Sequence, residues 1–487
     1  MQGQSITRND WLCIALVVIA GLALRALAFA PFDISHADEL MQYLEQGQRL
    51  ATGHGIVPWE YRYGARNELL PQLLALPFWL GAKIAPGTLA GMLAARWMFL
   101  ALTLLALPAA WRLGALTSRT HALAALLVAA VWYENVLFST LLLSEVLATA
   151  LIAMAAALLL SAAPSRAALR WAGLLLGLGV IVRLQYAPFV AVLALARLRL
   201  DWRAWRELAL GGVAALAVGA LSDLVAGQVP LRWIWVNLTY NVGQGRAARF
   251  GASGPFEYVW LLLLHLGPAA PLILAGALLS PARYRPLVLA LLANLLFHSL
   301  IAHKEYRFVW LSVWSITVLA GIASVSLTQA LAARRGMTLA PLMLAALGAL
   351  WLAASWAAQA QSGGARSLRG GAPIPLAANA AVAHTQPCGI ALPDQWRAHL
   401  VSALLPRAVP LYIAPAATMA QAEALPPGLV GAADVLIFPQ LPDGAPGYRE
   451  LTCRANAVLK ACVYVRPGGC LADPNWTYQT ALEREDL

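Results

Sequence analysis

The residues best suited to chemistry form a short charged motif between two long apolar stretches. The sequence HKEYRF contains His303, Lys304, Glu305 and Arg307, and the whole chain has only three lysines. Ionisable side chains beside a membrane-spanning helix are costly, which makes them functional candidates by default. Two cations and an imidazole could bind a phosphate. The alternative is that Lys304 and Arg307 simply extend their charged ends to the membrane interface.

A second group of charged and aromatic residues lies in the segment 32–70. The motifs SHADE and PWEYRYGARNE supply six candidates: His36, Asp38, Glu39, Trp59, Glu60 and Arg66. From spacing alone, Asp38 is equally compatible with capping a helix and with acting as a general base. Trp59 and Glu60 suit an interfacial aromatic belt, and they could equally contact a sugar.

Four more charged positions stand out in or beside apolar segments. Arg183 separates two short apolar segments, as in a broken helix that lines a cavity. Arg246 and Arg249 lie in a glycine-rich loop that allows close backbone approach; they could clamp a phosphate or be solvated on a flexible loop. Glu145 is buried near the start of a predicted span and needs a cationic partner, for which we expect an outer-face arginine. A purely structural pair is an equally good interpretation.

Composition identifies the solvent of most of the chain. The 487 residues are 60% hydrophobic and 12% charged, with a mean hydropathy of +0.67. Soluble globular proteins carry about 25% charged residues, so the chain is predicted to be an integral membrane protein. The net charge of +11 does not indicate nucleic-acid binding, because the arginines fall mainly in short loops where they set topology.

The apolar segments predict about eleven membrane spans. They are 11–31, 89–111, 121–138, 140–160, 171–183, 186–198, 207–226, 257–279, 286–301, 308–332 and 337–358. Arginine-rich loops alternate strictly with the others, which places the N-terminus inside. The outer face then receives the segments 32–70, 183–186, 227–256 and 302–307, together with the C-terminal tail.

The tail differs from the rest of the chain. We expect a transmembrane domain over 1–360, a Gly/Ala/Pro linker over 361–373 and a small α/β domain over 374–487. The strand-like runs CGIAL, VPLYIA, DVLIFP and CVYV indicate that α/β domain. Its four cysteines allow three pairings, and an outer location predicts one or two disulfides, with Cys462–Cys470 as a candidate.

An acid, several cations and aromatic residues on one face fit glycosyl transfer from a lipid-phosphate sugar. A carboxylate would deprotonate the acceptor hydroxyl, and cations would stabilise the departing phosphate. The competing hypothesis is a lipid or glycolipid transporter. Transporters place charges at the midplane between repeated halves, whereas these charges gather at one interface.

Four motifs together resemble glycosyltransferase family 22, the mannosyltransferases of GPI anchors and lipid-linked oligosaccharides that use dolichyl-phosphate mannose. They are HADE, PWEYRYGARNELLP, YNVGQGRAARFGASGPFEYVW and HKEYRF, in the family's order over roughly residues 10–330. HKEYRF matches the specific family pattern His-Lys-Glu-x-Arg-Phe. Ala37 replaces a family Pro, and Pro58 replaces a family Thr. The excess of Arg over Lys indicates a bacterial homologue, with a polyprenyl-phosphate mannose donor.

The resemblance implies a multi-span α-helical GT-C fold with two interfacial helices in the first outer loop. It also implies an inverting glycosyltransferase without a bound metal or other cofactor. Its partners would be polyprenyl-phosphate mannose, a glycan or glycolipid acceptor and membrane lipid, with no nucleic acid. A different lipid-phosphate sugar is the alternative donor. The enzyme would reside in the inner (plasma) membrane, with its active site and tail on the periplasmic side.

The resemblance also assigns roles by position. Asp38 is the expected general base, with Glu39 second. The donor phosphate falls to His303, Lys304, Arg307, Arg66 and Arg183, and substrate binding to His36, Trp59, Glu60 and Arg246.

Overall fold

The computed structural model describes residues 8–363, 369–419 and 423–486. It divides into two compact units. We name them the helical unit, Met1–Phe29 with Leu100–Gly364, and the mixed unit, Ala30–Phe99 with Ala365–Leu487. The mixed unit therefore joins the predicted C-terminal domain to the first outer loop and the residues after it. Residues 364–368 of the predicted linker lie outside the described residues.

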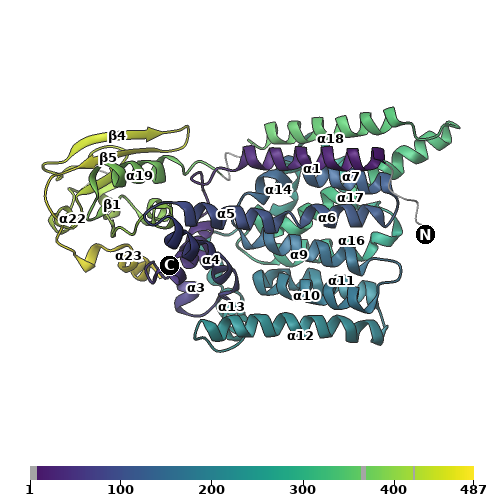
Figure 1. Cartoon of the computed structure of the whole chain (residues 1–487), viewed down its shortest axis with the longest axis horizontal. Helices are drawn as coiled ribbons and strands as arrows, with labels where there is room; N and C mark the ends of the chain where they lie inside the picture. The colour runs from purple at the N-terminus through teal and green to yellow at the C-terminus, as the bar shows by residue number, and fades with distance from the viewer. Residues whose placement is uncertain (1–7, 364–368, 420–422, 487) are drawn as a thin grey trace. The chain divides into compact units, whose positions relative to one another are not determined.

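The helical unit is built almost entirely from α-helices and short turns of helix (Figure 1). Its α-helices are α1 (Arg8–Ala28), α6 (Ala106–Ala115), α7 (Arg119–Val131), α8 (Tyr133–Ser139), α9 (Ser144–Leu159), α10 (Arg166–Val182), α11 (Ala187–Leu198), α12 (Trp202–Val225), α13 (Arg232–Leu238), α14 (Glu257–Leu266), α15 (Ala270–Leu278), α16 (Arg285–Leu300), α17 (Trp310–Arg334) and α18 (Pro341–Gln361). Turns at η2 (Leu184–Tyr186), η3 (Thr239–Gly243), η4 (Arg246–Phe250), η5 (Gly267–Ala269), η6 (Ala282–Tyr284) and η7 (Tyr306–Val309) connect them.

Each apolar segment predicted to span the membrane falls on helical residues. Among the described residues, 6 helices are long and apolar enough to cross a membrane, or 7 if the bent pair α7–α8 counts as one span. The multi-span helical class is confirmed, while the number eleven stays a prediction. Several predicted segments are shorter helices, such as α9, which suit a buried position in a bundle rather than a lipid-facing span.

Small residues let the helices of this unit approach closely. Helices α10 and α12 lie side by side (Figure 1). A Cβ at Gly173 would meet the Leu208 carbonyl oxygen at 2.0 Å, and a Cβ at Gly211 would meet the Arg170 carbonyl oxygen at 1.9 Å. Such close backbone contact is typical of helix pairs in membranes, where packing rather than the hydrophobic effect drives association.

The predicted span 121–138 is broken at Trp132, where α7 and α8 meet at 59°. The last carbonyls of α7 would be unsatisfied in an apolar environment. The buried guanidinium of Arg25 donates to the carbonyls of Ala129, at 2.9 Å, and Ala130, at 2.8 Å. The Ser355 hydroxyl donates to the Val131 carbonyl at 3.4 Å, so side chains from distant helices make the break tolerable.

The mixed unit contains helices from the first outer loop and a five-stranded sheet. Its helices and turns are η1 (Glu39–Leu44), α2 (Glu45–Thr52), α3 (Trp59–Arg62), α4 (Leu69–Ile84), the start of α5 (Ala90–Thr103), α19 (Pro373–Thr385), α20 (Gln395–Ala398), η9 (Ser402–Leu404), α21 (Ala416–Met419), α22 (Pro427–Ala432), η10 (Pro474–Trp476) and α23 (Tyr478–Glu485). The strands are β1 (Ile390–Leu392), β2 (Leu411–Ile413), β3 (Val435–Phe438), β4 (Arg449–Ala455) and β5 (Lys460–Val465).

The sheet has the order β2-β1-β3-β5-β4. β1 pairs in parallel with β2 and β3, whereas β5 pairs antiparallel with β3 and β4. Four of these strands coincide with the predicted runs. β4 was missed because its sequence, RELTCRA, is largely polar and its residues are mostly exposed at the edge of the sheet.

Both disulfides of this unit connect cysteines of the tail. Cys388 bonds to Cys470, and Cys453 bonds to Cys462. The prediction of one or two disulfides is confirmed, but the candidate pair Cys462–Cys470 is wrong. Cys453 and Cys462 are cross-strand partners in the β4–β5 register, which brings their sulfurs together.

Replacing Arg25 with Met should destabilise the helical unit more than replacing a surface arginine. The variant leaves buried carbonyls at the α7–α8 break without donors, at about 1–3 kcal/mol each. Thermal unfolding in detergent measures the effect. The matched control is Arg119→Met, whose partner Asp10 is 25% exposed and whose loss should cost at most about 1 kcal/mol. Equal melting temperatures for the two variants would contradict this account of the break.

Candidate active site

In the mixed unit, Asp38 stands at the beginning of a π-helical turn. The turn, η1, is entirely buried, whereas the Asp38 side chain is only partly buried. π-Helical turns are rare in proteins, and those that do occur are often found at functional sites. His36, also half-buried, precedes the turn. Asp38 therefore combines a fixed backbone with access for a reacting group.

Glu39 has a different environment from its neighbour. Its side chain has no exposure, and Oε2 lies 3.4 Å from the Arg96 guanidinium on α5, itself 1% exposed. Breaking such a buried ion pair is strongly destabilising. The geometry therefore gives Glu39 a structural partner and favours Asp38 as the acid that meets a substrate.

Two further ionisable residues, Glu60 and Arg66, belong to the group around Asp38. Burial raises the pKa of Glu60, Arg66 lowers it and Asp38 raises it. Burial alone would lower the pKa of Arg66, but Tyr43, Glu60 and Asp38 outweigh burial and raise it. Asp38 is therefore one of the charges that act on both Glu60 and Arg66.

Hydrogen bonds hold this group in place. Gln42 donates to Glu60 Oε1 at 2.7 Å, and Arg66 donates to the Tyr43 hydroxyl at 3.0 Å. Trp59 is only 5% exposed, so most of its surface is covered by protein. The arrangement is that of a packed site with one accessible carboxylate.

Residues of the C-terminal tail form hydrogen bonds with both ends of the segment that carries Asp38. The Arg369 guanidinium donates to the carbonyls of Ala30 and Asp33 at 2.9 and 2.8 Å. The Asp33 carboxylate accepts from the Gly370 N–H at 2.6 Å. Farther along, Val57 N–H donates to the Gln479 side chain at 2.9 Å. The segment is therefore ordered by the C-terminal part of its own unit.

In the helical unit, the buried carboxylate Glu145 organises the cations. Glu145 Oε1 lies 3.2 Å from Arg183 and 3.4 Å from Arg307, and Glu145 is fully buried. The expected arginine partner of Glu145 is present, and there are two. Arg183 leaves the end of α10 with an extended backbone, as the predicted helix break requires.

Glu305, within the HKEYRF motif, supplies the second carboxylate of this cluster. Its two oxygens accept from Arg307 at 2.6 and 3.1 Å, and His303 Nε2 lies 3.0 Å from Oε1. The guanidiniums of Arg183 and Arg307 lie 5.1 and 5.0 Å from the Phe308 ring centroid. Arg307 is therefore held by two carboxylates and one aromatic ring.

Lys304 and His303 connect the motif to the glycine-rich loop. The Lys304 ammonium donates to the carbonyls of Ser253, at 3.1 Å, and Ile301, at 2.6 Å. His303 Nδ1 lies 3.2 Å from the Gly251 carbonyl oxygen, where φ is +115°. Because only glycine adopts this backbone conformation readily, Gly251 allows the loop to reach His303. Arg246, on the same loop, is buried over the Tyr240 ring at 5.8 Å.

The motif cluster carries more positive than negative charge. Arg183, Arg307 and Lys304 supply three cations, whereas Glu145 and Glu305 supply two carboxylates, which leaves an excess of one positive charge. A buried or half-buried excess cation favours an anionic ligand. The cluster can therefore stabilise a phosphate without losing its internal pairs.

Among the described residues, two groups contain side chains of the kinds that can bind a metal ion. They are Cys388 with Asp434 and Cys470, and Glu450 with Cys453 and Cys462. The cysteines of each group are disulfide-bonded to each other, so they do not supply thiolate ligands.

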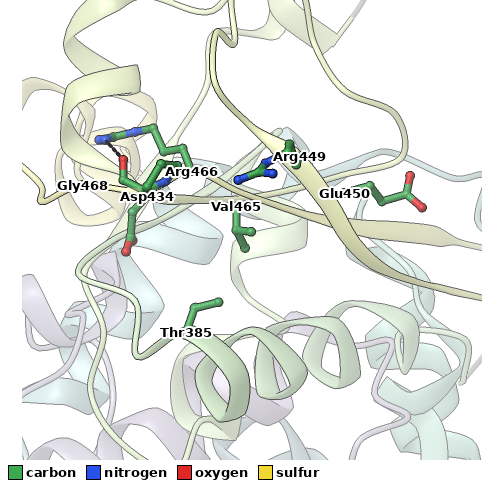
Figure 2. A pocket seen from close by; sticks show the side chains of 8 residues that line it. Thr385, Asp434, Arg449, Glu450, Val465, Arg466 and Gly468 are labelled. Carbon is green, nitrogen blue, oxygen red and sulfur yellow. Dashed lines mark hydrogen bonds between the residues drawn. The ribbon is translucent and has the colours of Figure 1, made fainter.

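A separate cavity of about 540 Å³ opens at one end of the sheet (Figure 2). Its lining includes Asp434, Arg449, Glu450 and Arg466, and no residue predicted to be catalytic. Asp434 accepts from the Cys388 and Gly389 N–H groups, and Arg466 donates to the Val430 and Ala433 carbonyls. Two of the four charged groups therefore serve the local fold.

The sequence did not single out several buried or half-buried ionisable residues that this structure uses. Arg25, Arg96, Glu134, His265 and Arg369 were absorbed into predicted spans or the linker. For four of them, the sequence offered one signal, which is an ionisable residue inside an apolar segment. Their partners could not be named, because each partner comes from a distant part of the chain.

Lowering the pH should destabilise the mixed unit through His399. This histidine is buried against the Tyr478 hydroxyl, and burial lowers its pKa to about 3 although Asp38 raises it. The unfolded chain therefore binds the extra proton between about pH 6.5 and 3, and stability falls as pH drops through that window. From pH 7.5 to pH 5 the loss is about 2 kcal/mol.

The test compares melting temperatures of the wild type, His399→Gln and the exposed control His384→Gln between pH 5 and 8. His399→Gln should show a flatter pH dependence, while His384→Gln should follow the wild type. The raised pKa values of Glu45 and Glu60 act in the opposite sense but are common to all three proteins. Parallel curves for wild type and His399→Gln would refute the buried neutral imidazole.

Comparison with known proteins gives the family. The Alg9-like mannosyltransferase family matches residues 16–369, most of the chain. GPI alpha-1,2-mannosyltransferase 3 of Danio rerio is 34% identical over 105 residues, 20% of this chain and 19% of that protein. GPI mannosyltransferase 3 of Trypanosoma brucei brucei is 39% identical over 70 residues, 14% of this chain and 12% of that protein. The matched part is thus less than a fifth of either relative.

Solved structures show the fold. ArnT from Cupriavidus metallidurans in the apo state has a TM-score of 0.59 at 13% identity, covering 94% of this chain and 98% of that one. Its complex with undecaprenyl phosphate gives 0.56 at 13% identity, covering 83% and 86%. The oligosaccharyltransferase AglB from Archaeoglobus fulgidus, in complex with an inhibitory peptide and a dolichol-phosphate, gives 0.51 at 14% identity, covering 82% and 64%. The chain belongs to the Alg9-like mannosyltransferase family, and its fold is that of the GT-C membrane glycosyltransferases.

Proposed function

We propose that this protein is an inverting membrane glycosyltransferase that moves mannose from a polyprenyl-phosphate carrier to a glycan or glycolipid acceptor. The observation that carries the proposal is the excess positive charge of the HKEYRF cluster, held in place by Glu145 and Glu305. The family membership supports mannose as the sugar. The ArnT and AglB complexes contain lipid phosphates, which supports the same kind of carrier here.

In the proposed reaction, the acceptor hydroxyl oxygen attacks the anomeric carbon of the donor sugar. Asp38 takes the hydroxyl proton as the new carbon–oxygen bond forms. The bond between the anomeric carbon and the phosphate oxygen breaks, and the lipid monophosphate leaves with the bonding electrons. The cations of the HKEYRF cluster stabilise the charge that develops on that phosphate.

Each predicted residue except Glu39, which pairs with Arg96, keeps a distinct part in the proposal. Arg183 and Arg307 present charge to the phosphate from fixed positions, and Lys304 and His303 order the glycine-rich loop that covers it. Arg66 and Glu60 hold the surroundings of Asp38. We assign His36, Trp59 and Arg246 to contacts with the substrates. No resident metal or cofactor enters the reaction.

We place the reaction on the outer face of the plasma membrane. The alternation of arginine-rich loops supports this side, because the segments with Asp38 and HKEYRF lie opposite those loops. The two disulfides of the mixed unit support it independently, since disulfides persist in oxidising compartments.

Replacing Asp38 with Asn should abolish most sugar transfer while preserving the fold. Loss of a general base lowers kcat by about a hundredfold to ten-thousandfold. The assay follows radiolabelled mannose from polyprenyl-phosphate mannose into membrane acceptors, with purified protein in nanodiscs. The matched control is Asp443→Asn, an exposed carboxylate of the same unit, which should transfer at the wild-type rate.

Donors with other sugars on the same carrier define the specificity. Transfer of mannose in preference to the other sugars supports the assignment, while faster use of another lipid-phosphate sugar would replace mannose as the substrate. Full activity in a folded Asp38→Asn variant would remove Asp38 from the base role.

A further inference from the structure

Tyr306 occupies the position that the family pattern His-Lys-Glu-x-Arg-Phe leaves open, yet its side chain is firmly held. Its ring is 8% exposed and stacks on the His265 imidazole, with centroids 3.8 Å apart and planes at 11°. On another side it meets the edge of Phe138 at 6.3 Å. Helices α14 and α8 thus supply an aromatic support for the motif, which the proposed reaction does not require as such.

His265 is itself fixed by groups at the start of α8. Its Nδ1 lies 3.4 Å from Oε1 of Glu134, and its carbonyl oxygen accepts from the Tyr133 hydroxyl at 2.6 Å. Glu134 is 1% exposed, and its Oε2 accepts from the Trp132 indole at 3.1 Å. Glu134 Oε1 makes no hydrogen bond among the described residues, and the His265 imidazole at 3.4 Å is a polar group that faces it.

The position of Glu134 follows from the break between α7 and α8. Arg25 donates to the last carbonyls of α7, immediately before the break from which α8 begins. Farther along α8, Phe138 stacks on Trp310 with centroids 3.8 Å apart and planes at 3°. Trp310 directly follows η7, so α8 contacts the beginning and the end of the turn that carries Arg307.

We propose that Glu134 and His265 are positioning residues that hold Tyr306 and thereby set the geometry of Glu305 and Arg307. Tyr306 lies between these two residues in the chain, and they bond to each other at 2.6 Å. A displacement of the Tyr306 ring therefore moves both members of the pair. The effect on donor binding rests on the proposed function, whereas the effect on the motif's order does not.

The first test measures order directly. Hydrogen exchange by mass spectrometry should show faster exchange over 301–310 in His265→Leu than in the wild type. The matched control is His121→Leu, a histidine 2% exposed in the same unit, bound to Ser118 and Ser326 instead of the motif. Unchanged exchange over 301–310 in His265→Leu, or an equal increase in His121→Leu, would overturn the proposal.

The second test measures coupling in transfer from polyprenyl-phosphate mannose. His265→Leu and Tyr306→Leu should each raise the donor KM about tenfold, with the acceptor KM unchanged, because each removes the same stacking contact. The double variant should then show about tenfold as well, rather than about a hundredfold, since two residues in contact are not additive. An additive hundredfold effect, or an unchanged donor KM, would refute shared positioning.

The two tests separate this inference from the proposed function. If the wild type transfers no sugar from any lipid-phosphate donor, the proposed function fails. The exchange experiment still decides whether His265 orders the motif. If transfer occurs and exchange over 301–310 is unaffected, the inference alone fails.

Discussion

A carboxylate with no access to solvent, Glu145, sets the arrangement of the helical unit's charged residues. Desolvating such a group costs several kcal/mol unless cations and hydrogen bonds compensate. Arg183 and Arg307 provide this compensation from two separate segments of the chain, at 3.2 and 3.4 Å. To do so, the chain must leave helical geometry after α10 and again between α16 and α17. Both helix breaks therefore bring an arginine to one buried charge.

The same constraint explains how arginine side chains can be kept in fixed positions. Arginines without carboxylate partners would turn toward water or lipid headgroups. Here Glu145 and Glu305 hold Arg307 rigidly, and Lys304 contributes the charge that leaves the cluster positive. Fixed dipoles and charges require no reorganisation when a phosphate leaves, which is the main source of electrostatic catalysis. In the mixed unit, Asp38 stands at the start of the buried turn η1 while staying partly accessible.

Sequence reasoning succeeded where local patterns decide the outcome. Apolar stretches gave the helices, and the burial of Glu145 in one of them predicted an arginine partner. Predictions from the sequence failed where residues distant in the chain determine the local structure. The break at Trp132 has no Pro or Gly signal, because its stability comes from Arg25 and Ser355. The Cys388–Cys470 pairing depends on the sheet order, which the spacing of cysteines does not encode.

The proposed reaction is a direct displacement at the anomeric carbon, with the lipid phosphate as leaving group. The most direct measurement is proton NMR of the transferred mannose, compared with a polyprenyl-phosphate mannose donor of known anomeric configuration. A single displacement with Asp38 as base predicts a product of opposite anomeric configuration. A product that retains the donor's configuration would require a covalent glycosyl intermediate on a second carboxylate, and it would contradict the account.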